Sequence, residues 1–275
     1  MVRGGLSSVS FRNTSAEGVI GIAKAAGVSG IEWSADTHAP LGDDAQTERL
    51  MMATLRARLT VSAYGSFHRI SSREREGAAE CFAPVVRTGL RLQAPSIRVW
   101  GGPPSEGSTE ILIDNARTLA DIAGKQGITL CLEPHERSIV KDYRTLYDIV
   151  EAVRHPFFKA CWAPLRGESS LEKECGIVPA EFIHLVHVRN WTADYSRKSL
   201  RENPACLTAA IQALIERARI SKLDCWALLE YIENEDTDVL RQEITALASL
   251  VEHYANATPT TPKEEPVKGS PSKSS

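Results

Sequence analysis

The sequence has no excess of basic residues, no apolar run of membrane-spanning length and no apolar leader near its start. Its 32 Lys and Arg are outnumbered by 35 Asp and Glu, which gives a formal net charge of −3. Such a balance supplies no positive field to attract nucleic acid or an anionic membrane. A bilayer span needs roughly 20 apolar residues in succession, and a signal peptide needs an apolar core. We therefore expect a cytoplasmic protein that binds neither nucleic acid nor membranes.

Cysteine pairs are also missing, and aromatic residues make up only 6% of the chain. The six cysteines are scattered, and no two of them form a Cys-x-x-Cys pair. This spacing argues against a disulfide framework and favours reduced cysteines that pack in the core. With 43% hydrophobic and 24% charged residues, the 275-residue chain has the composition of a globular protein.

Residues 256–275 differ in composition from the rest of the chain. They contain four prolines together with many Thr, Ser and Lys residues and almost no apolar side chains. Such a segment cannot bury enough apolar surface to offset its ordering entropy. We expect a flexible tail here and one folded domain over residues 1–255.

Within residues 1–255, short apolar runs alternate with helical patterns. The runs predict strands at Leu6–Phe11, Gly30–Trp33, Thr60–Ser66, Ser96–Trp100, Ile128–Pro134, Lys159–Pro164, Phe182–Trp191 and Cys225–Tyr231. The segments between them predict helices at Gly18–Ala26, Gln46–Leu59, Arg73–Leu90, Glu110–Lys125, Tyr143–Val153, Ser169–Gly176, Pro204–Arg219 and Asp236–His253. Most of the strands are apolar on both faces, as in a parallel sheet covered by helices.

Eight successive strand–helix units predict an α/β fold, a single (β/α)8 TIM barrel. A doubly wound open sheet is the alternative. Such a sheet usually carries a Gly-rich phosphate loop after its first strand, and Ser10-Phe11-Arg12-Asn13 is not one. The barrel is therefore the predicted fold.

Two predicted strands end in an acidic residue, and a third carries a histidine. Glu133 closes the fifth strand, Glu230 closes the eighth, and His187 lies in the seventh. A carboxylate at the end of an apolar run is costly to bury unless a partner compensates its charge. Because barrel strands point their C-terminal ends at one mouth, these three side chains form a set suited to Mn2+, Mg2+, Co2+ or Zn2+. The alternative is that each acid is a structural residue bonded to the backbone.

Aromatic, basic and histidine side chains also follow the predicted strands. The aromatic residues suggest an apolar-walled pocket for sugar faces or a flatter metabolite, although packing at the barrel top explains some of them equally well. The arginines suit a phosphate or carboxylate, or else form ordinary salt bridges. The substrate-binding candidates are Trp33, His38, Tyr64, His68, Arg98, Trp100, His135, Trp162, Arg189, Trp191 and Arg197.

Together these segments resemble the sugar phosphate isomerase/epimerase, or xylose isomerase-like, family of TIM barrels. The resemblance extends to about residue 254. It is carried by Gly30-Ile31-Glu32-Trp33, Asp36-x-His38-x-Pro40, Gly42-Asp43, Ala63-Tyr64-Gly65-Ser66, Ile97-Arg98-Val99-Trp100, Glu133-x-His135, Val186-His187-Val188 with Trp191, and Leu228-Leu229-Glu230-Tyr231.

The resemblance implies a divalent metal held by Glu on strand five, Asp on strand six, His on strand seven and Glu on strand eight. Glu133, His187 and Glu230 match this pattern, whereas the sixth strand, Lys159–Pro164, has no Asp. Cys161 is a conceivable ligand there but reads better as a packing thiol. Water in the gap, substitution by His135, or loss of the metal are the remaining interpretations, and we favour a retained but altered site.

The function that the resemblance implies is a metal-assisted isomerase or epimerase of a small hydroxycarbonyl compound. Glu133 and Glu230 would transfer the proton during enolisation. A lyase or dehydratase and a metal-free binding protein are the alternatives. An apurinic-site-type endonuclease is disfavoured, because its three-zinc cluster needs more ligands than these strand ends supply. Relatives of this type are often dimers or tetramers, so the resemblance also allows a homo-oligomer with a small-molecule substrate.

Overall fold

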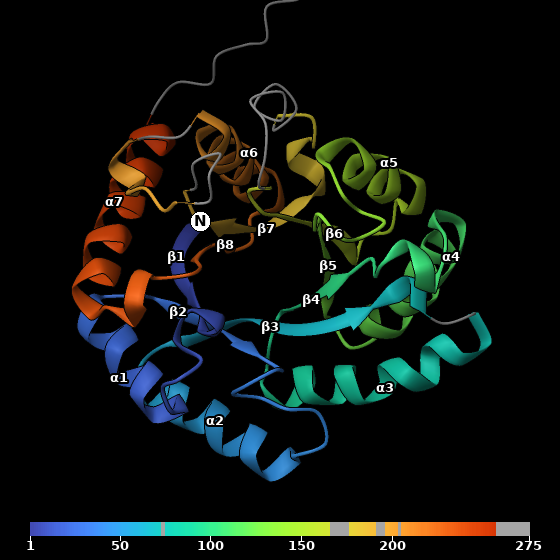
Figure 1. Ribbon diagram of the computed structural model, residues 1–275, viewed down its shortest axis with the longest axis horizontal. Coiled ribbons are helices and arrows are strands. Elements are labelled where there is room, and N and C mark those ends of the chain that lie inside the picture. The colour runs from blue at the N-terminus through green and yellow to red at the C-terminus, as the bar shows by residue number, and fades with distance from the viewer. Residues whose placement is uncertain (73–74, 166–175, 191–195, 203–204, 257–275) are drawn as a thin grey trace, which may run out of the picture.

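Eight parallel strands close into a barrel in the computed structural model, in the order β1-β2-β3-β4-β5-β6-β7-β8 (Figure 1). The structure describes residues 1–72, 75–165, 176–190, 196–202 and 205–256. The strands are β1 (Val2–Ser7), β2 (Gly30–Ser34), β3 (Thr60–Arg69), β4 (Ser96–Trp100), β5 (Thr129–Glu133), β6 (Phe158–Trp162), β7 (Ile183–Val188) and β8 (Cys225–Leu229). Pairing of β1 with β8, from Val2↔Cys225 to Leu6↔Leu229, closes the barrel.

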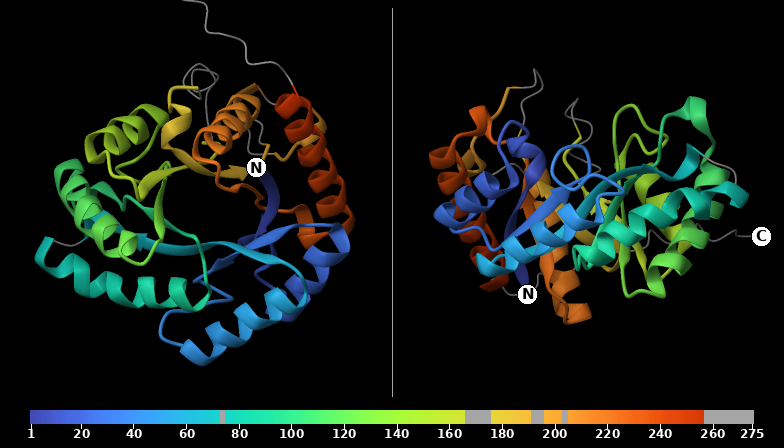
Figure 2. Two further views of the ribbon diagram at one scale, coloured as in Figure 1. Left: turned by 180° about the vertical axis from the view of Figure 1, so that it is seen from behind. Right: turned by 90° about the horizontal axis from the view of Figure 1, so that it is seen from below.

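Helices surround the barrel on its outside, one after most strands (Figures 1 and 2). They are α1 (Ala16–Ala26), α2 (Asp44–Arg56), α3 (Arg75–Arg91), α4 (Thr109–Gly124), α5 (Tyr143–Val153), α6 (Ala205–Ser221) and α7 (Thr237–Asn256). Short 3-10 turns occupy η1 (Ser8–Phe11), η2 (Ile70–Ser72), η3 (Pro104–Glu106), η5 (Ala180–Phe182), η6 (Leu200–Glu202) and η7 (Glu233–Glu235).

Side-chain caps explain where several helices begin. The Ser15 hydroxyl accepts a hydrogen bond from Gly18 N, and Asp43, Ser108 and Asp142 cap α2, α4 and α5 in the same way. At its other end α1 stops at Gly27, whose φ of 83° suits a residue without a Cβ. Each cap satisfies a backbone N–H that the first helical turn leaves without a partner.

The predicted barrel is confirmed, with shifts at some boundaries. The largest shift concerns the first strand, which was expected at Leu6–Phe11 but spans Val2–Ser7. Residues Ser8–Phe11 instead form a buried 3-10 turn, so their apolar character reflects packing and not strand pairing. The predicted helix at Ser169–Gly176 lies almost entirely outside the described residues, and so does the predicted tail from residue 257 onward.

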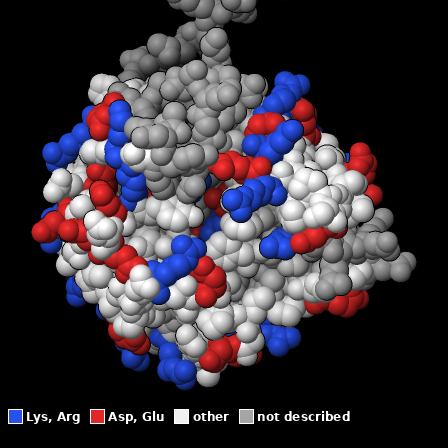
Figure 3. All heavy atoms as spheres, in the orientation of Figure 1, with Lys and Arg blue, Asp and Glu red and all other residues white. Residues whose placement is uncertain are grey.

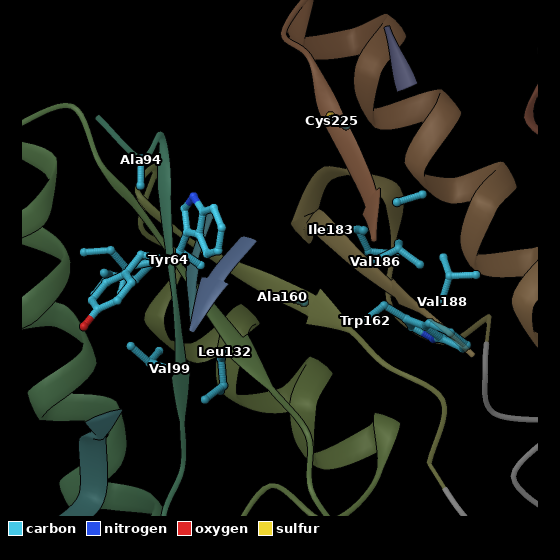
Figure 4. Close-up of a cluster of buried hydrophobic side chains, with 14 of the residues drawn as sticks. Tyr64, Ala94, Val99, Leu132, Ala160, Trp162, Ile183, Val186, Val188 and Cys225 are labelled. Carbon is cyan, nitrogen blue, oxygen red and sulfur yellow. The ribbon is translucent and has the colours of Figure 1, made fainter. Parts of the chain in front are cut away.

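Two apolar clusters fill the molecule, one outside the strands and one inside the barrel. Outward-facing residues such as Val99, Leu132 and Val186 pack against the helices in the larger cluster (Figure 4). The inner cluster consists of Ala63, Cys131, Cys161, Leu185, Trp226 and Leu228. Cys131, Cys161 and Cys225 are free and buried, as predicted for packing cysteines, whereas Cys81 is free but exposed. The inner cluster fills the barrel interior, which leaves the strand ends for polar groups.

On the surface seen in Figure 3, acidic and basic side chains of the described residues are intermixed. No helix in the described part of the chain is long and apolar enough to cross a membrane.

Candidate active site

Three of the predicted functional side chains meet inside the barrel at the C-terminal ends of its strands. Glu133 is the last residue of β5, His187 lies near the end of β7, and Glu230 directly follows β8. All three are buried, with at most 4% of any residue exposed. Strand alternation turns the neighbouring residues Leu132 and Val186 outward, so the fold directs these polar groups inward.

The imidazole of His187 lies between carboxylates on both of its edges. Its Nε2 is 3.0 Å from Glu32 Oε2. On the other edge, Nδ1 is 3.4 Å from Glu133 Oε1 and 3.5 Å from Glu230 Oε1. Among the described residues, Nδ1 finds no hydrogen-bond partner of acceptable geometry although it is fully buried.

This arrangement fits a divalent cation. One nitrogen or oxygen atom from each of Glu133, His187 and Glu230 lies within 4.8 Å of the others. A buried Nδ1 without a partner is rare and needs an explanation. A cation among the three atoms supplies one, because it attracts two carboxylate oxygens and the imidazole lone pair at once.

The buried Arg98 and the partly buried Arg189 each hold one oxygen of a glutamate. Arg98 Nη1 donates to Glu133 Oε2 at 2.6 Å, and Trp100 Nε1 donates to the same oxygen at 2.6 Å. Arg189 donates to Glu230 Oε2 and also to the carbonyl oxygen of Pro164. Each glutamate therefore has one oxygen fixed by the protein and the other turned toward His187.

The charges of the site favour an additional cation. The carboxylates of Glu32, Glu133 and Glu230 face two guanidiniums, so one negative charge remains uncompensated. Burial opposes the charged form of His187, but the surrounding carboxylates raise its pKa well above the usual value. A proton on His187 neutralises this charge in one state. A divalent ion in place of that proton also offsets it and leaves one positive charge at the site.

Glu32 belongs to this cluster, although sequence reasoning assigned it no role. Its Oε1 accepts hydrogen bonds from Ser7 Oγ at 3.0 Å and from Arg98 Nη2 at 2.9 Å. Burial alone would raise the pKa of Glu32, but the charges of Arg98 and His187 lower it to about 2. The same reasoning that singled out Glu133, a carboxylate in an apolar run, applies equally to Ile31-Glu32-Trp33.

Gly65 makes room for the contact between Glu32 and Arg98. A Cβ at this position would lie 2.6 Å from Arg98 Nη2 and 2.8 Å from Glu32 Oε1. Any side chain larger than hydrogen would therefore press on the ion pair. The glycine in the segment Ala63-Tyr64-Gly65-Ser66 thus serves the buried polar cluster.

A pocket of about 230 Å³ opens above Glu133 and Glu230. Phe67, Trp100 and His135 form one wall, with ring centroids 5.0 Å apart for the first pair and 5.1 Å for the second. Tyr231 lines the pocket too, and the guanidinium of Arg189 lies 5.4 Å from the centre of its ring. Phe67 and Tyr231 have φ of 54° and 56°, which side chains other than glycine seldom adopt. The backbone is thus strained at two aromatic residues that line the pocket.

Three aromatic candidates lie elsewhere. Trp33 Nε1 donates to Thr54 of α2, Tyr64 Oη donates to the Ala39 carbonyl, and Trp162 stacks on Tyr143 of α5 at 5.5 Å. All are fully buried against the helices. The expectation that they face the mouth is wrong, because each neighbours an inward-facing residue and strand alternation turns it outward.

The remaining candidates are placed as follows. His38 is buried between Ser8 Oγ and the Thr14 carbonyl, each 3.1 Å from a ring nitrogen. His68 lines a separate hollow, where burial lowers its pKa to about 4. Arg197 donates to the Glu230 carbonyl at 2.8 Å, next to the site. Trp191 lies outside the described residues.

The sixth strand brings no acid to the cluster. Cys161 faces the inner apolar cluster, and burial raises the pKa of its thiol to about 12, which disfavours a thiolate ligand. The strand β6 ends at Trp162, which pairs with Val186, and continuing this register by one residue sets the buried Ala163 opposite His187. Ala163 therefore occupies the place where the resemblance implies a fourth ligand. His135 is not part of the group formed by Glu133, His187 and Glu230, and its ring packs on Trp100 instead.

Three solved structures illustrate what the fold is similar to. A fusion protein of a xylose isomerase-like TIM barrel with a 4-hydroxyphenylpyruvate dioxygenase has a TM-score of 0.73 at 14% identity; the match covers 92% of this chain but only 43% of that one. The probable 3-DHS dehydratase AsbF of Bacillus anthracis has a TM-score of 0.68 at 18% identity, with 90% and 99% covered. D-Psicose 3-epimerase from Clostridium cellulolyticum H10, solved with D-tagatose, has a TM-score of 0.67 at 14% identity, with 93% and 100% covered.

These structures share the fold at identities too low to transfer an activity. No curated protein matches the sequence. The sequence model of one family, however, matches residues 20–250, which is most of the barrel. Its match agrees with the closed eight-stranded sheet. The chain belongs to the xylose isomerase-like TIM-barrel family.

Proposed function

We propose that the protein is a divalent-metal-dependent isomerase or epimerase of a small hydroxycarbonyl compound. The observation that carries the proposal is the convergence of Glu133, His187 and Glu230 on one point, with His187 Nδ1 lacking a hydrogen bond to any described residue. These three residues would hold Mn2+, Mg2+, Co2+ or Zn2+. When bound, such an ion polarises a substrate carbonyl and acidifies the adjacent C–H bond.

The two glutamates are the groups placed to move the proton. Both line the pocket. One carboxylate takes the proton from the carbon next to the carbonyl, and the C–H electron pair forms the double bond of an enediolate. Return of the proton to the neighbouring carbon, with transfer of the hydroxyl proton to the former carbonyl oxygen, gives isomerisation. Return to the opposite face of the same carbon re-forms the original carbonyl and gives epimerisation.

The glutamates are not equivalent. Glu133 Oε2 accepts from both Arg98 and Trp100, whereas for Glu230 Oε2 the described donor is Arg189 alone. Two strong donors make a carboxylate a weaker base. Glu230 is therefore the better candidate to accept the proton first, and Glu133 is the better candidate to hold the ion.

Around Glu133 and Glu230, the pocket offers aromatic ring faces and positively charged side chains to a substrate. The Phe67–Trp100–His135 wall offers ring faces to the apolar side of a sugar or of a flat metabolite. A volume of about 230 Å³ suits a small metabolite. Arg12, which forms an ion pair with Asp36, and Arg137 also line the pocket and offer positive charge to an anionic group of the substrate.

Dehydration is the second candidate function. It uses the same proton abstraction, followed by loss of a hydroxyl group from the next carbon. The similarity to a probable dehydratase motivates it, together with an aromatic wall that suits a ring as well as an open chain. Mass spectrometry of the product separates the two functions, because dehydration removes one water and isomerisation leaves the mass unchanged.

Exchange of substrate hydrogen with solvent tests the proposal. Aldoses, ketoses and cyclic hydroxyketones are incubated with Mn2+ and enzyme in D2O, and deuterium next to the carbonyl is followed by NMR. We expect the wild type to label at least one compound class, and Glu133→Gln or Glu230→Gln to lose at least about 100-fold in rate. Glu106→Gln, which alters an exposed ion pair with Arg69, is the matched control. Full exchange in both active-site variants would overturn the assignment.

A further inference from the structure

Glu32 lies directly behind His187, on the side away from Glu133 and Glu230. It is fully buried in β2 and its Oε2 is 3.0 Å from His187 Nε2. The segment Gly30-Ile31-Glu32-Trp33 places it there because Ile31 and Trp33 pack outward against the helices. No step of the proposed reaction uses this carboxylate, so its burial calls for another reason.

The carboxylate of Glu32 is itself held in one orientation. Ser7 Oγ, Arg98 Nε and Arg98 Nη2 all donate to Oε1, at 3.0, 3.2 and 2.9 Å. These three bonds engage Oε1 and leave Oε2 for the imidazole. Gly65 permits the arrangement, since a Cβ there would collide with both partners.

An ionised carboxylate accepts hydrogen bonds and cannot donate them. The ring nitrogen that faces Glu32 must therefore carry the proton, and in a neutral imidazole the opposite nitrogen is bare. That nitrogen is Nδ1, the atom directed at the oxygens of Glu133 and Glu230. A carboxylate behind a metal-binding histidine selects the tautomer and fixes the ring in this way.

We propose that Glu32 is a positioning residue that fixes the proton on His187 Nε2 and presents Nδ1 as a metal ligand. This inference rests on the proposed function. The competing view is that Glu32 is only the counter-ion of Arg98. In that case the Oε2 contact with His187 has no consequence, and replacing it leaves metal affinity unchanged.

Glu32→Gln tests the difference. A glutamine must turn its NH2 either toward His187, which forces the proton onto Nδ1, or toward Arg98, which is itself a donor. We expect Mn2+ affinity, measured by calorimetry, to fall about 10- to 100-fold. Glu235→Gln is the matched control, because Glu235 accepts from Asn13 and Thr14 at the barrel rim. Its Mn2+ affinity should stay within about twofold of the wild type.

Nitrogen-15 NMR of the histidine rings in the Zn2+-loaded wild type provides the second readout. We expect His187 to carry a slowly exchanging proton on Nε2, and Glu32→Gln to lose that signal. If Glu32 acts only as the counter-ion of Arg98, replacing it leaves the Nε2 proton signal of His187 unchanged. If Glu32→Gln fails to fold, the wild-type spectrum still decides, because a proton on Nδ1 contradicts the proposal.

The outcomes separate this inference from the proposed function. A wild type that binds Mn2+ and a folded Glu32→Gln that binds it equally, with the Nε2 proton in place, overturn the role of Glu32 alone. A wild type that binds neither Mn2+ nor Zn2+ overturns both. A selective loss of affinity and of the Nε2 proton in Glu32→Gln supports both.

Discussion

Arg98 Nη1 lies 2.6 Å from Glu133 Oε2 inside the barrel, with only 1% and 5% of the two side chains exposed. The same guanidinium bonds to Glu32, so one arginine of β4 joins the carboxylates of β2 and β5. Its Cζ atom also lies 5.0 Å from the centre of the Phe67 ring. The ion pair therefore links the metal-binding candidates to the wall of the pocket.

Replacing this arginine should be costly. Arg98→Met leaves Glu32 and Glu133 buried without their cation, and loss of one partner of a buried pair typically costs about 3–5 kcal/mol in the free energy of unfolding. Urea unfolding of the metal-free protein measures the effect. The control Arg117→Met removes an exposed pair with Asp114 and should cost under about 1 kcal/mol. Equal losses of unfolding free energy in the two variants would show that the buried ion pairs of Arg98 stabilise the fold no more than an exposed pair does.

The strained backbone at Phe67 predicts an unusual order of stability. Its φ of 54° penalises any residue with a Cβ, whereas glycine adopts this conformation freely. Phe67→Ala and Phe67→Gly both lose the ring, so their difference reports the backbone alone. Thermal unfolding should find Phe67→Gly more stable than Phe67→Ala by about 1 kcal/mol. The usual order, with alanine more stable, would contradict the left-handed conformation.

His184 predicts part of the pH dependence of stability. It points away from the barrel interior, and burial together with the charges of Arg217 and Lys159 lowers its pKa to about 4 from 6.5. The folded state thus disfavours the protonated form. The stability is complete above about pH 6.5 and is lost as the pH falls toward 4, by about 3 kcal/mol.

The variant His184→Leu should show a shallower loss over the same interval. Unfolding by urea at several pH values between 7 and 4 gives both curves. Other acidic groups titrate in both proteins and cancel in the difference. Parallel curves would mean that His184 has an ordinary pKa in the folded protein.

Ala163 offers a gain-of-function test of the altered site. Ala163→Asp adds a carboxylate beside His187, where the sixth strand lacks an acid. More ligand charge raises cation affinity, and we expect Mn2+ to bind about tenfold more tightly, equivalent to roughly 1.4 kcal/mol. The variant Ala163→Asn has nearly the same shape without the charge and should gain much less. Unchanged affinity in a folded Ala163→Asp protein would place the fourth position elsewhere.

The barrel was predictable because its signals are local and repeated. Each strand is a short apolar run, and most helices begin at a polar cap such as Ser15 or Ser108. The first strand was misplaced, because the apolar Val9 and Phe11 of a buried 3-10 turn resemble a strand in sequence. A short run of apolar residues looks the same in the sequence whether it is buried in a turn or in a strand of the sheet.

The site was predictable only in part. Glu133, His187 and Glu230 stand out as polar groups in apolar runs, and the structure brings them together. Whether a nearby aromatic side chain points into the barrel or toward the helices depends on the alternation along its strand. An error of one residue in the predicted register exchanges the two directions. Trp33 and Glu32 illustrate this, since the tryptophan was assigned to the mouth and the glutamate beside it is the residue that faces inward.

The most direct test of the central claim is an anomalous difference map from crystals grown with Mn2+. We predict one strong peak within bonding distance of Glu133 Oε1, His187 Nδ1 and Glu230 Oε1. We also predict that His187 Nε2 remains bonded to Glu32 in the same crystal. Crystals of the folded protein that show no peak among these three atoms, or one bound only elsewhere, would contradict the account.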